Sequence, residues 1–219
     1  MRLYGIDFET GTQKALTVFA EKGQEVELVE VNILKGEDKL PAHLLRHPFG
    51  EIPVLEDDGF LLCESRAIIR YLDQRLPGAS LTPGDIKQRA LMEQWISVEQ
   101  CYFSGAVHVI VSSAPIYQAL CQSEAGANFP PPPDPPSLNR ALAEVARVLD
   151  VLAKVLDRQD YLAGPMFSLA EITWMPYLRY LLASPGGEMI HSRPSVAAWW
   201  QRISTRPSWA RVGRVVGQA

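Results

Sequence analysis

The sequence predicts two domains of different fold class, an α/β domain over residues 1–78 and an all-helical domain over residues 81–219. Two observations support this. Strand and helix patterns alternate in the first third of the chain, whereas only helical patterns follow. The charge also shifts: residues 1–80 carry 9 basic and 14 acidic residues (net −5), leaving 21 − 9 = 12 basic and 25 − 14 = 11 acidic residues (net +1) for the remainder.

The chain begins with a strand–helix–strand pattern. Residues 2–6 are typical of a short strand, and Thr10 and Thr12 are candidates to cap a helix that runs to Gly23. Residues 26–31 alternate apolar and acidic side chains, as a half-buried strand does. The length of the connection suits a parallel crossover.

A hairpin and a helix complete the first domain. Pro53 lacks a backbone donor just where a strand begins, so it indicates an edge strand, the first residue of a strand or a special turn. Residues 56–59 indicate a hairpin turn and 60–63 its second strand. Ser65 opens an amphipathic helix that ends at Leu76-Pro77-Gly78.

The rest of the chain is predicted to be helical. Residues 87–111 and 138–156 are long amphipathic stretches, and a further helix covers 193–203. Residues 168–171 have the spacing of a capping box. The proline-rich run 129–136 is predicted to be neither helix nor central strand, and it is a stiff loop or a docking peptide.

Composition excludes several function classes. A net charge of −4 gives no basic surface for nucleic acid, and no apolar run is long enough for a membrane helix. Cys63, Cys101 and Cys121 are widely spaced and odd in number, which indicates a reduced, cytoplasmic chain without disulfides or a zinc site. The four histidines lack ligand spacing, so no metal site is predicted.

Two junctions are candidate binding features. A cis bond at Ile52-Pro53 would turn the backbone of Ile52 outward to pair with an extended ligand, whereas an ordinary trans proline is the alternative. Glu64-Ser65 lies where a strand meets a helix. There the Ser65 hydroxyl and the helix dipole suit a carboxylate and Glu64 suits an ammonium group, although Ser65 as a plain helix cap explains the same residues.

These motifs resemble the cytosolic glutathione transferases, and most closely the phi class. The resemblance implies a thioredoxin-like domain, a helical domain that contributes a hydrophobic substrate pocket, a homodimer and a cis bond at Ile52-Pro53. It implies that glutathione, the co-substrate, attacks a hydrophobic electrophile. It covers nearly the whole chain outside the proline-rich insert, and the motifs that carry it are HPFGEIPVLED (47–57), ESRAI (64–68), YLAG (161–164), FSLAE (167–171), RP (193–194), WW (199–200) and RPSW (206–209).

The resemblance assigns a glutathione site residue by residue. Glu64 and Ser65 match residues that hold the γ-glutamyl end, and Ile52, before Pro53, matches the residue whose backbone pairs with the cysteinyl unit. Lys39 matches a basic residue near the glycyl carboxylate, although a solvated loop lysine is the simpler explanation.

Two acidic residues depart from the family pattern beside this site. Glu51 stands where the family usually has Gln, and Asp38 where plant phi members often have His. Both add negative charge next to an anionic tripeptide, which predicts weak glutathione affinity. They therefore favour an alternative function, a ligand carrier of the same fold.

The position that activates the glutathione thiol in the phi class departs further from the family pattern. Alignment places Glu9 where phi members carry a serine that hydrogen-bonds the glutathione thiolate, and Thr10 and Thr12 are the nearest hydroxyls. An ionised carboxylate about 4 Å from the sulfur opposes the thiolate by roughly 4 kcal/mol at an effective dielectric near 20, or about three pKa units. We therefore expect Glu9 to point away, to be protonated, or to act as a general base.

Our working hypothesis has Glu9 facing the substrate and Thr10 serving the thiol, whereas simple capping by Thr10 and Thr12 is the alternative. A dedicated glutathione-dependent isomerase, lyase or biosynthetic enzyme that uses Glu9 as its acid–base group is also open. Tyr4 is expected to be a core residue.

Overall fold

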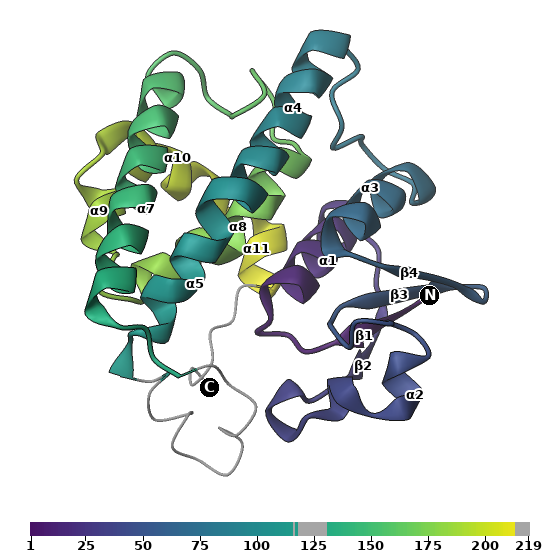
Figure 1. The fold of residues 1–219 in the computed structure, drawn as a ribbon. Coiled ribbons are helices and arrows are strands. Elements are labelled where there is room, and N and C mark those ends of the chain that lie inside the picture. The colour runs from purple at the N-terminus through teal and green to yellow at the C-terminus, as the bar shows by residue number, and fades with distance from the viewer. Residues whose placement is uncertain (116, 118–130, 213–219) are drawn as a thin grey trace. The chain divides into compact units, whose positions relative to one another are not determined.

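The computed structural model describes residues 1–115, 117 and 131–212, which fall into two compact units. The first unit contains residues 1–80 together with α11 (Pro207–Val212), and the second contains the described part of residues 81–206. All strands belong to the first unit, and the second is helical (Figure 1).

The first unit is built on a four-stranded sheet in the order β2-β1-β3-β4. β1 (Arg2–Gly5) and β2 (Glu27–Glu30) run parallel and are joined by α1 (Thr10–Glu21). β3 (Val54–Asp57) pairs antiparallel with both β1 and β4 (Phe60–Cys63). This mixed sheet confirms the α/β prediction, including the parallel crossover.

Shorter elements connect the strands. Two 3-10 turns (Ile33–Lys35 and Glu37–Lys39) and α2 (Pro41–Leu44) lie between β2 and β3. The predicted hairpin turn between β3 and β4 is confirmed, because Asp58 and Gly59 have φ values of 50° and 85°, as tight two-residue turns require. α3 (Ser65–Arg75) follows β4.

The two faces of the sheet carry separate apolar clusters. On one face Tyr4, Val31 and Val54 pack together, and the Tyr4 hydroxyl donates to Glu56 Oε2 at 2.6 Å. This confirms Tyr4 as a packing residue. The alternate positions Leu3 and Leu55 are completely buried, as expected for the opposite face. The helices α1 and α3 lie side by side (Figure 1), and their apolar side chains are buried: Ala15, Val18, Phe19, Ile68, Ile69 and Leu72.

A buried ion pair joins the C-terminal ends of α1 and α3. Lys22 Nζ lies 2.7 Å from Asp73 Oδ1, and both side chains are at most 2% exposed. The same ammonium group donates to the carbonyls of Asp73 and Ala79, so three acceptors surround it. Such a set of acceptors offsets the cost of taking the charge out of water.

The helix α11 packs against α1 in the first unit. Its Trp209 is 3% exposed, and the Ser208 hydroxyl donates to the Glu21 carboxylate. The structure thus places residues 207–212 outside the predicted helical domain, since a helical pattern does not reveal against which unit a helix packs.

The second unit is an all-helical bundle, as predicted. Its helices are α4 (Ile86–Val98), α5 (Ser104–Ser112), α7 (Pro135–Leu156), α8 (Leu169–Leu182), α9 (Glu188–His191) and α10 (Pro194–Ser204). A π-helical turn, Glu99–Phe103, joins α4 to α5. No helix in the described part of the chain is long and apolar enough to cross a membrane.

The start of α7 corrects one expectation. Pro135 and Pro136 were assigned to a non-helical run, yet they occupy the first turn of α7 behind the cap Asp134, whose carboxylate accepts from Ser137 N at 2.8 Å. Proline fits there because first-turn N–H groups have no partner within the helix. Residues 129 and 130 of the same run lie outside the described residues.

The core of the second unit is centred on Trp174. Its indole N–H donates to the carbonyl of Trp95 at 3.1 Å, and Phe103 and Trp199 contact its ring. The predicted capping box is confirmed before α8. Trp95, Trp174, Trp199 and Trp209 are buried as expected, whereas Trp200 is half-buried.

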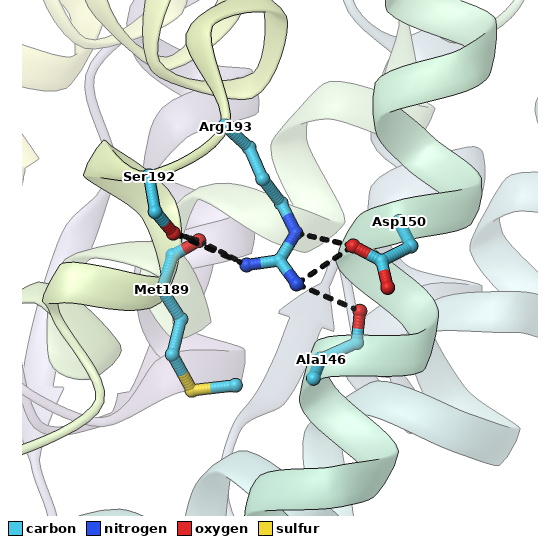
Figure 2. Close-up of polar contacts among 5 residues, drawn as sticks. All are labelled: Ala146, Asp150, Met189, Ser192 and Arg193. Carbon is cyan, nitrogen blue, oxygen red and sulfur yellow. Dashed lines mark hydrogen bonds and ion pairs between the residues drawn. The ribbon is translucent and has the colours of Figure 1, made fainter.

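Arg193 connects three helices of this unit (Figure 2). Its guanidinium lies 2.7 Å from Asp150 Oδ1 and donates to the carbonyl of Ala146, both in α7. It also donates to the carbonyl of Met189 in α9 at 2.7 Å. Since Arg193 immediately precedes α10, this one side chain fixes the α9–α10 corner against α7.

Candidate active site

The Ile52-Pro53 bond is cis, as the resemblance implied, and it lies immediately before β3. Pro53 is buried and Ile52 is half-buried. The preceding Gly50 has φ = 63°, a left-handed conformation that favours glycine, and an added Cβ there would lie 2.9 Å from the Asp38 carbonyl. This turn sets the position of the Ile52 backbone.

Three of the predicted site segments meet at Gly11. A Cβ placed on Gly11 would lie 2.8 Å from Pro53 Cδ, 3.1 Å from Ser65 Cβ and 3.1 Å from Glu9 Oε2. Only glycine allows this approach, because any larger residue would collide with the proline ring. The start of α1, the cis-proline and the start of α3 therefore form one surface region. Sequence reasoning missed Gly11, whose only signal was a glycine in the first turn of a helix.

Glu9 caps α1 through both oxygens of its carboxylate, and each oxygen accepts two hydrogen bonds. Oε1 accepts from Gly11 N at 2.6 Å and from the Thr10 hydroxyl at 3.0 Å. Oε2 accepts from Thr12 N at 2.7 Å and from the Thr12 hydroxyl at 3.0 Å. The carboxylate thus occupies the positive end of the α1 dipole, where an anion is stabilised.

This geometry corrects the expected caps and differs from the working hypothesis. Thr10 and Thr12 were candidates to cap the helix, but Glu9 is the cap. Both hydroxyls point at the Glu9 carboxylate, so either one must leave it before it can donate to a thiol. The reason is local: an extended residue before a helix brings its own carboxylate onto the free N–H groups of the first turn.

The start of α3 is arranged differently. Glu64 occupies the cap position with φ = 71° and ψ = 104°, an uncommon conformation for a residue with a side chain, and no side chain caps this helix. Ser65 is the first helical residue, so it is not the plain cap considered above. Glu64 is exposed and Ser65 is half-buried, which leaves this helix start accessible to a ligand carboxylate.

Lys39 lies among acceptors of its own chain. Its ammonium group is 3.0 Å from Asp38 Oδ2 and 3.5 Å from Glu51 Oε1, and it donates to the Gly50 carbonyl. The hydrogen bond with Asp38 is the main cause that raises the pKa of Lys39. The two acidic departures from the family pattern therefore both pair with the lysine expected near the glycyl carboxylate.

His43 is a site residue that sequence reasoning missed. Its ring is 3% exposed, and Nε2 donates to the Glu51 carbonyl at 2.7 Å, one residue before Ile52. Its Nδ1 has no hydrogen-bond partner among the described residues. The neighbouring His47 is equally buried, and burial is the main cause that lowers its pKa below 6.5. No pattern connects His43 with Glu51, because the contact crosses a loop.

The described residues contain no group of three or more His, Cys, Asp or Glu side chains that would hold a metal ion. The described cysteines, Cys63 and Cys101, are free thiols, and Cys121 lies outside the described residues.

A thioredoxin-like unit with a cis-proline before β3, followed by a helical unit, is the architecture of the two-domain glutathione transferases. Family models agree: the N-terminal domain of glutathione S-transferase matches residues 1–74 and its C-terminal domain matches residues 112–207. The chain belongs to the glutathione S-transferase family.

The relatives are phi-class enzymes, which confirms the class resemblance. The chain is 32% identical over 216 residues to the probable glutathione S-transferase GSTF2 of rice, covering 99% of this chain and 97% of the relative. The crystal structure of glutathione transferase F7 from Populus trichocarpa superposes with a TM-score of 0.85 at 34% identity, covering 96% of each chain. Glutathione S-transferase I from maize, solved with an atrazine glutathione conjugate, gives 0.83 at 30% identity, covering 97% and 95%.

Proposed function

We propose that this transferase binds glutathione across the surface where the starts of α1 and α3 meet Pro53. The observation that carries the proposal is the convergence at Gly11 of the cis-proline, Ser65 and Glu9. The uncapped start of α3 receives the γ-glutamyl carboxylate through Ser65 and the first N–H groups, and Glu64 pairs with the γ-glutamyl ammonium group.

The remaining glutathione contacts follow the chain from the cis bond. The Ile52 backbone, next to the cis bond and just before β3, pairs with the cysteinyl unit. Lys39 serves the glycyl carboxylate, but Asp38 and Glu51 already neutralise its charge. We therefore expect this end of glutathione to contribute little affinity.

The reaction joins the glutathione sulfur to a hydrophobic electrophile. The sulfur forms a bond to carbon, and the leaving group departs with its electron pair. The maize relative, solved with a glutathione conjugate of atrazine, supports a small apolar electrophile. At the thiol end we place Glu9, with Thr10 and Thr12 acting through the carboxylate that they both contact. The helical unit contributes the hydrophobic pocket.

Calorimetric titration with glutathione tests this site. Ser65→Ala removes one hydrogen bond to a charged group, so the Kd should rise roughly tenfold to a hundredfold. Ser192→Ala, an exposed serine of the second unit, should leave the Kd unchanged. Equal affinity in Ser65→Ala and the unaltered protein would remove the α3 start from the site.

A ligand carrier is the second candidate function, and the pairing of Lys39 with two carboxylates favours it. A carrier would bind apolar ligands but show no turnover with a generic electrophile such as a chlorodinitrobenzene. Tight glutathione binding with poor generic turnover would instead identify a dedicated isomerase, lyase or biosynthetic enzyme.

We further propose a homodimer in the cytoplasm. Large apolar side chains on either side of α2 are exposed: Leu40, just before this helix, by 54%, and Leu45 and Phe49, between α2 and β3, by 85% and 77%. Exposed apolar side chains of this size, when they form a patch, mark protein interfaces. Light scattering of Phe49→Glu should show a monomer if this surface holds the second copy, and an unchanged dimer mass would exclude it.

A further inference from the structure

The chain supplies its own anion at the start of α1. Two backbone N–H groups and two hydroxyl groups, from Thr10, Gly11 and Thr12, all donate to Glu9 at 2.6–3.0 Å. These are the donors that a helix start offers to a bound anion. The start of α3, in contrast, has no side-chain cap. Of the two helix starts that meet at Gly11, the start of α1 is capped by the Glu9 carboxylate, whereas no described side chain caps the start of α3.

This difference determines which form of sulfur fits beside Glu9. A thiolate about 4 Å from an ionised carboxylate is disfavoured about a thousandfold relative to the thiol, at an effective dielectric near 20. The donors that would stabilise the thiolate are also engaged with Glu9. A protonated thiol avoids the charge repulsion, and its S–H can donate to a Glu9 oxygen in place of one of the two threonine hydroxyls.

We propose that this site binds glutathione with its thiol protonated, and that Glu9 accepts the thiol proton during attack. The inference rests on the proposed glutathione site. In the step, the S–H proton passes to a Glu9 oxygen as the sulfur–carbon bond forms, and the leaving group departs with its electron pair. Glu9 then releases the proton to water, so no oxidant or reductant is required.

Glutathione and S-methylglutathione form a matched pair of probes, because they differ at the sulfur alone. Free thiols ionise near pH 8.5. Between pH 6.5 and 9.5 the Kd of glutathione should therefore rise about tenfold relative to that of S-methylglutathione. The ratio of the two Kd values cancels the titration of every other group. A ratio that falls with pH would overturn the proposal.

Two variants separate charge from capping. Serine and aspartate both cap helices well, so Glu9→Ser removes the charge and Glu9→Asp keeps it, while α1 retains a cap in each. The ultraviolet thiolate band of bound glutathione should be absent near pH 7 in the unaltered protein and in Glu9→Asp, and present in Glu9→Ser. A thiolate band in the unaltered protein, or its absence in Glu9→Ser, would overturn the proposal. Failure of both probes to bind would instead reject the glutathione site itself.

Turnover tests the proton transfer separately. Glu9→Gln keeps the size of the side chain but cannot accept the proton, so kcat should fall by about a hundredfold or more, within the usual range for general-base catalysis. Thermal unfolding of the same variant checks that α1 remains folded. Unchanged kcat in a folded Glu9→Gln would overturn the role of Glu9 as proton acceptor.

Discussion

Glu9 and Thr12 form a double contact at the start of α1: Glu9 Oε2 lies 2.7 Å from the backbone nitrogen of Thr12 and 3.0 Å from its hydroxyl oxygen. Thr12 is completely buried, and a Cβ on Gly5 of β1 would overlap its hydroxyl. The carboxylate is therefore held against the end of β1. The carboxylate that caps α1 is therefore also the group that we place at the thiol end of the site.

Thr12→Val should lower the free energy of unfolding by about 1 kcal/mol, because the Glu9 carboxylate loses one hydroxyl donor. Thr10→Val should cost less, since Thr10 is half-buried and water can replace its hydroxyl. Urea unfolding of the two variants measures the difference. Equal effects would show that the Thr12 hydroxyl does not hold Glu9.

Lys22→Met should destabilise the first unit by about 3–5 kcal/mol, because the buried, charged Asp73 loses its ion pair with Lys22. Adding Asp73→Leu should recover most of this loss, since the uncompensated charge is then gone. Denaturant unfolding of both variants provides the test. A double variant no more stable than Lys22→Met alone would contradict the charge argument.

His43→Leu should raise the KM for glutathione several-fold with a smaller change in kcat, because the Glu51 carbonyl before the cis bond loses its donor. His43→Gln retains an N–H donor and should restore part of the affinity. A KM that is equal in the leucine and glutamine variants would mean that His43 contributes packing alone.

The pH dependence of stability should reflect His47. Burial lowers its folded-state pKa below 6.5, so the unfolded chain binds more protons in this range. The stabilising contribution is therefore complete above about pH 6.5 and is lost as the pH falls through the folded-state pKa. Glu64, His43, Glu51 and Lys39 act on the same ring, and burial outweighs them.

Thermal unfolding between pH 7.5 and 5 measures this effect. His47→Gln should flatten the decline in stability on the acid side, whereas His191→Gln, which alters an exposed histidine, should leave the decline unchanged. An identical decline in the unaltered protein and His47→Gln would assign the acid sensitivity to other groups.

Local patterns account for most of the fold that was predicted. Alternation, helical spacing and the capping box at Ser168 depend on residues close in the chain, and the structure confirms the strands, the hairpin turn and the helices that they indicated. The prediction that α11 belongs to the helical domain was wrong, because a helical pattern does not show which apolar surface the helix packs against. The helical prolines at the start of α7 were missed because a proline breaks a helix only beyond its first turn.

The sequence by itself determined the order of elements, the family and the candidate residues Glu9, Ile52, Glu64 and Ser65, because these depend on short motifs and their spacing. The tertiary structure alone decided how those residues act together. It brought Glu9, Pro53 and Ser65 close to Gly11. The hydroxyls of Thr10 and Thr12 both donate to Glu9, and His43 donates to the Glu51 carbonyl. Hydrogen bonds and close contacts between segments depend on the three-dimensional path of the backbone, which spacing along the chain does not specify.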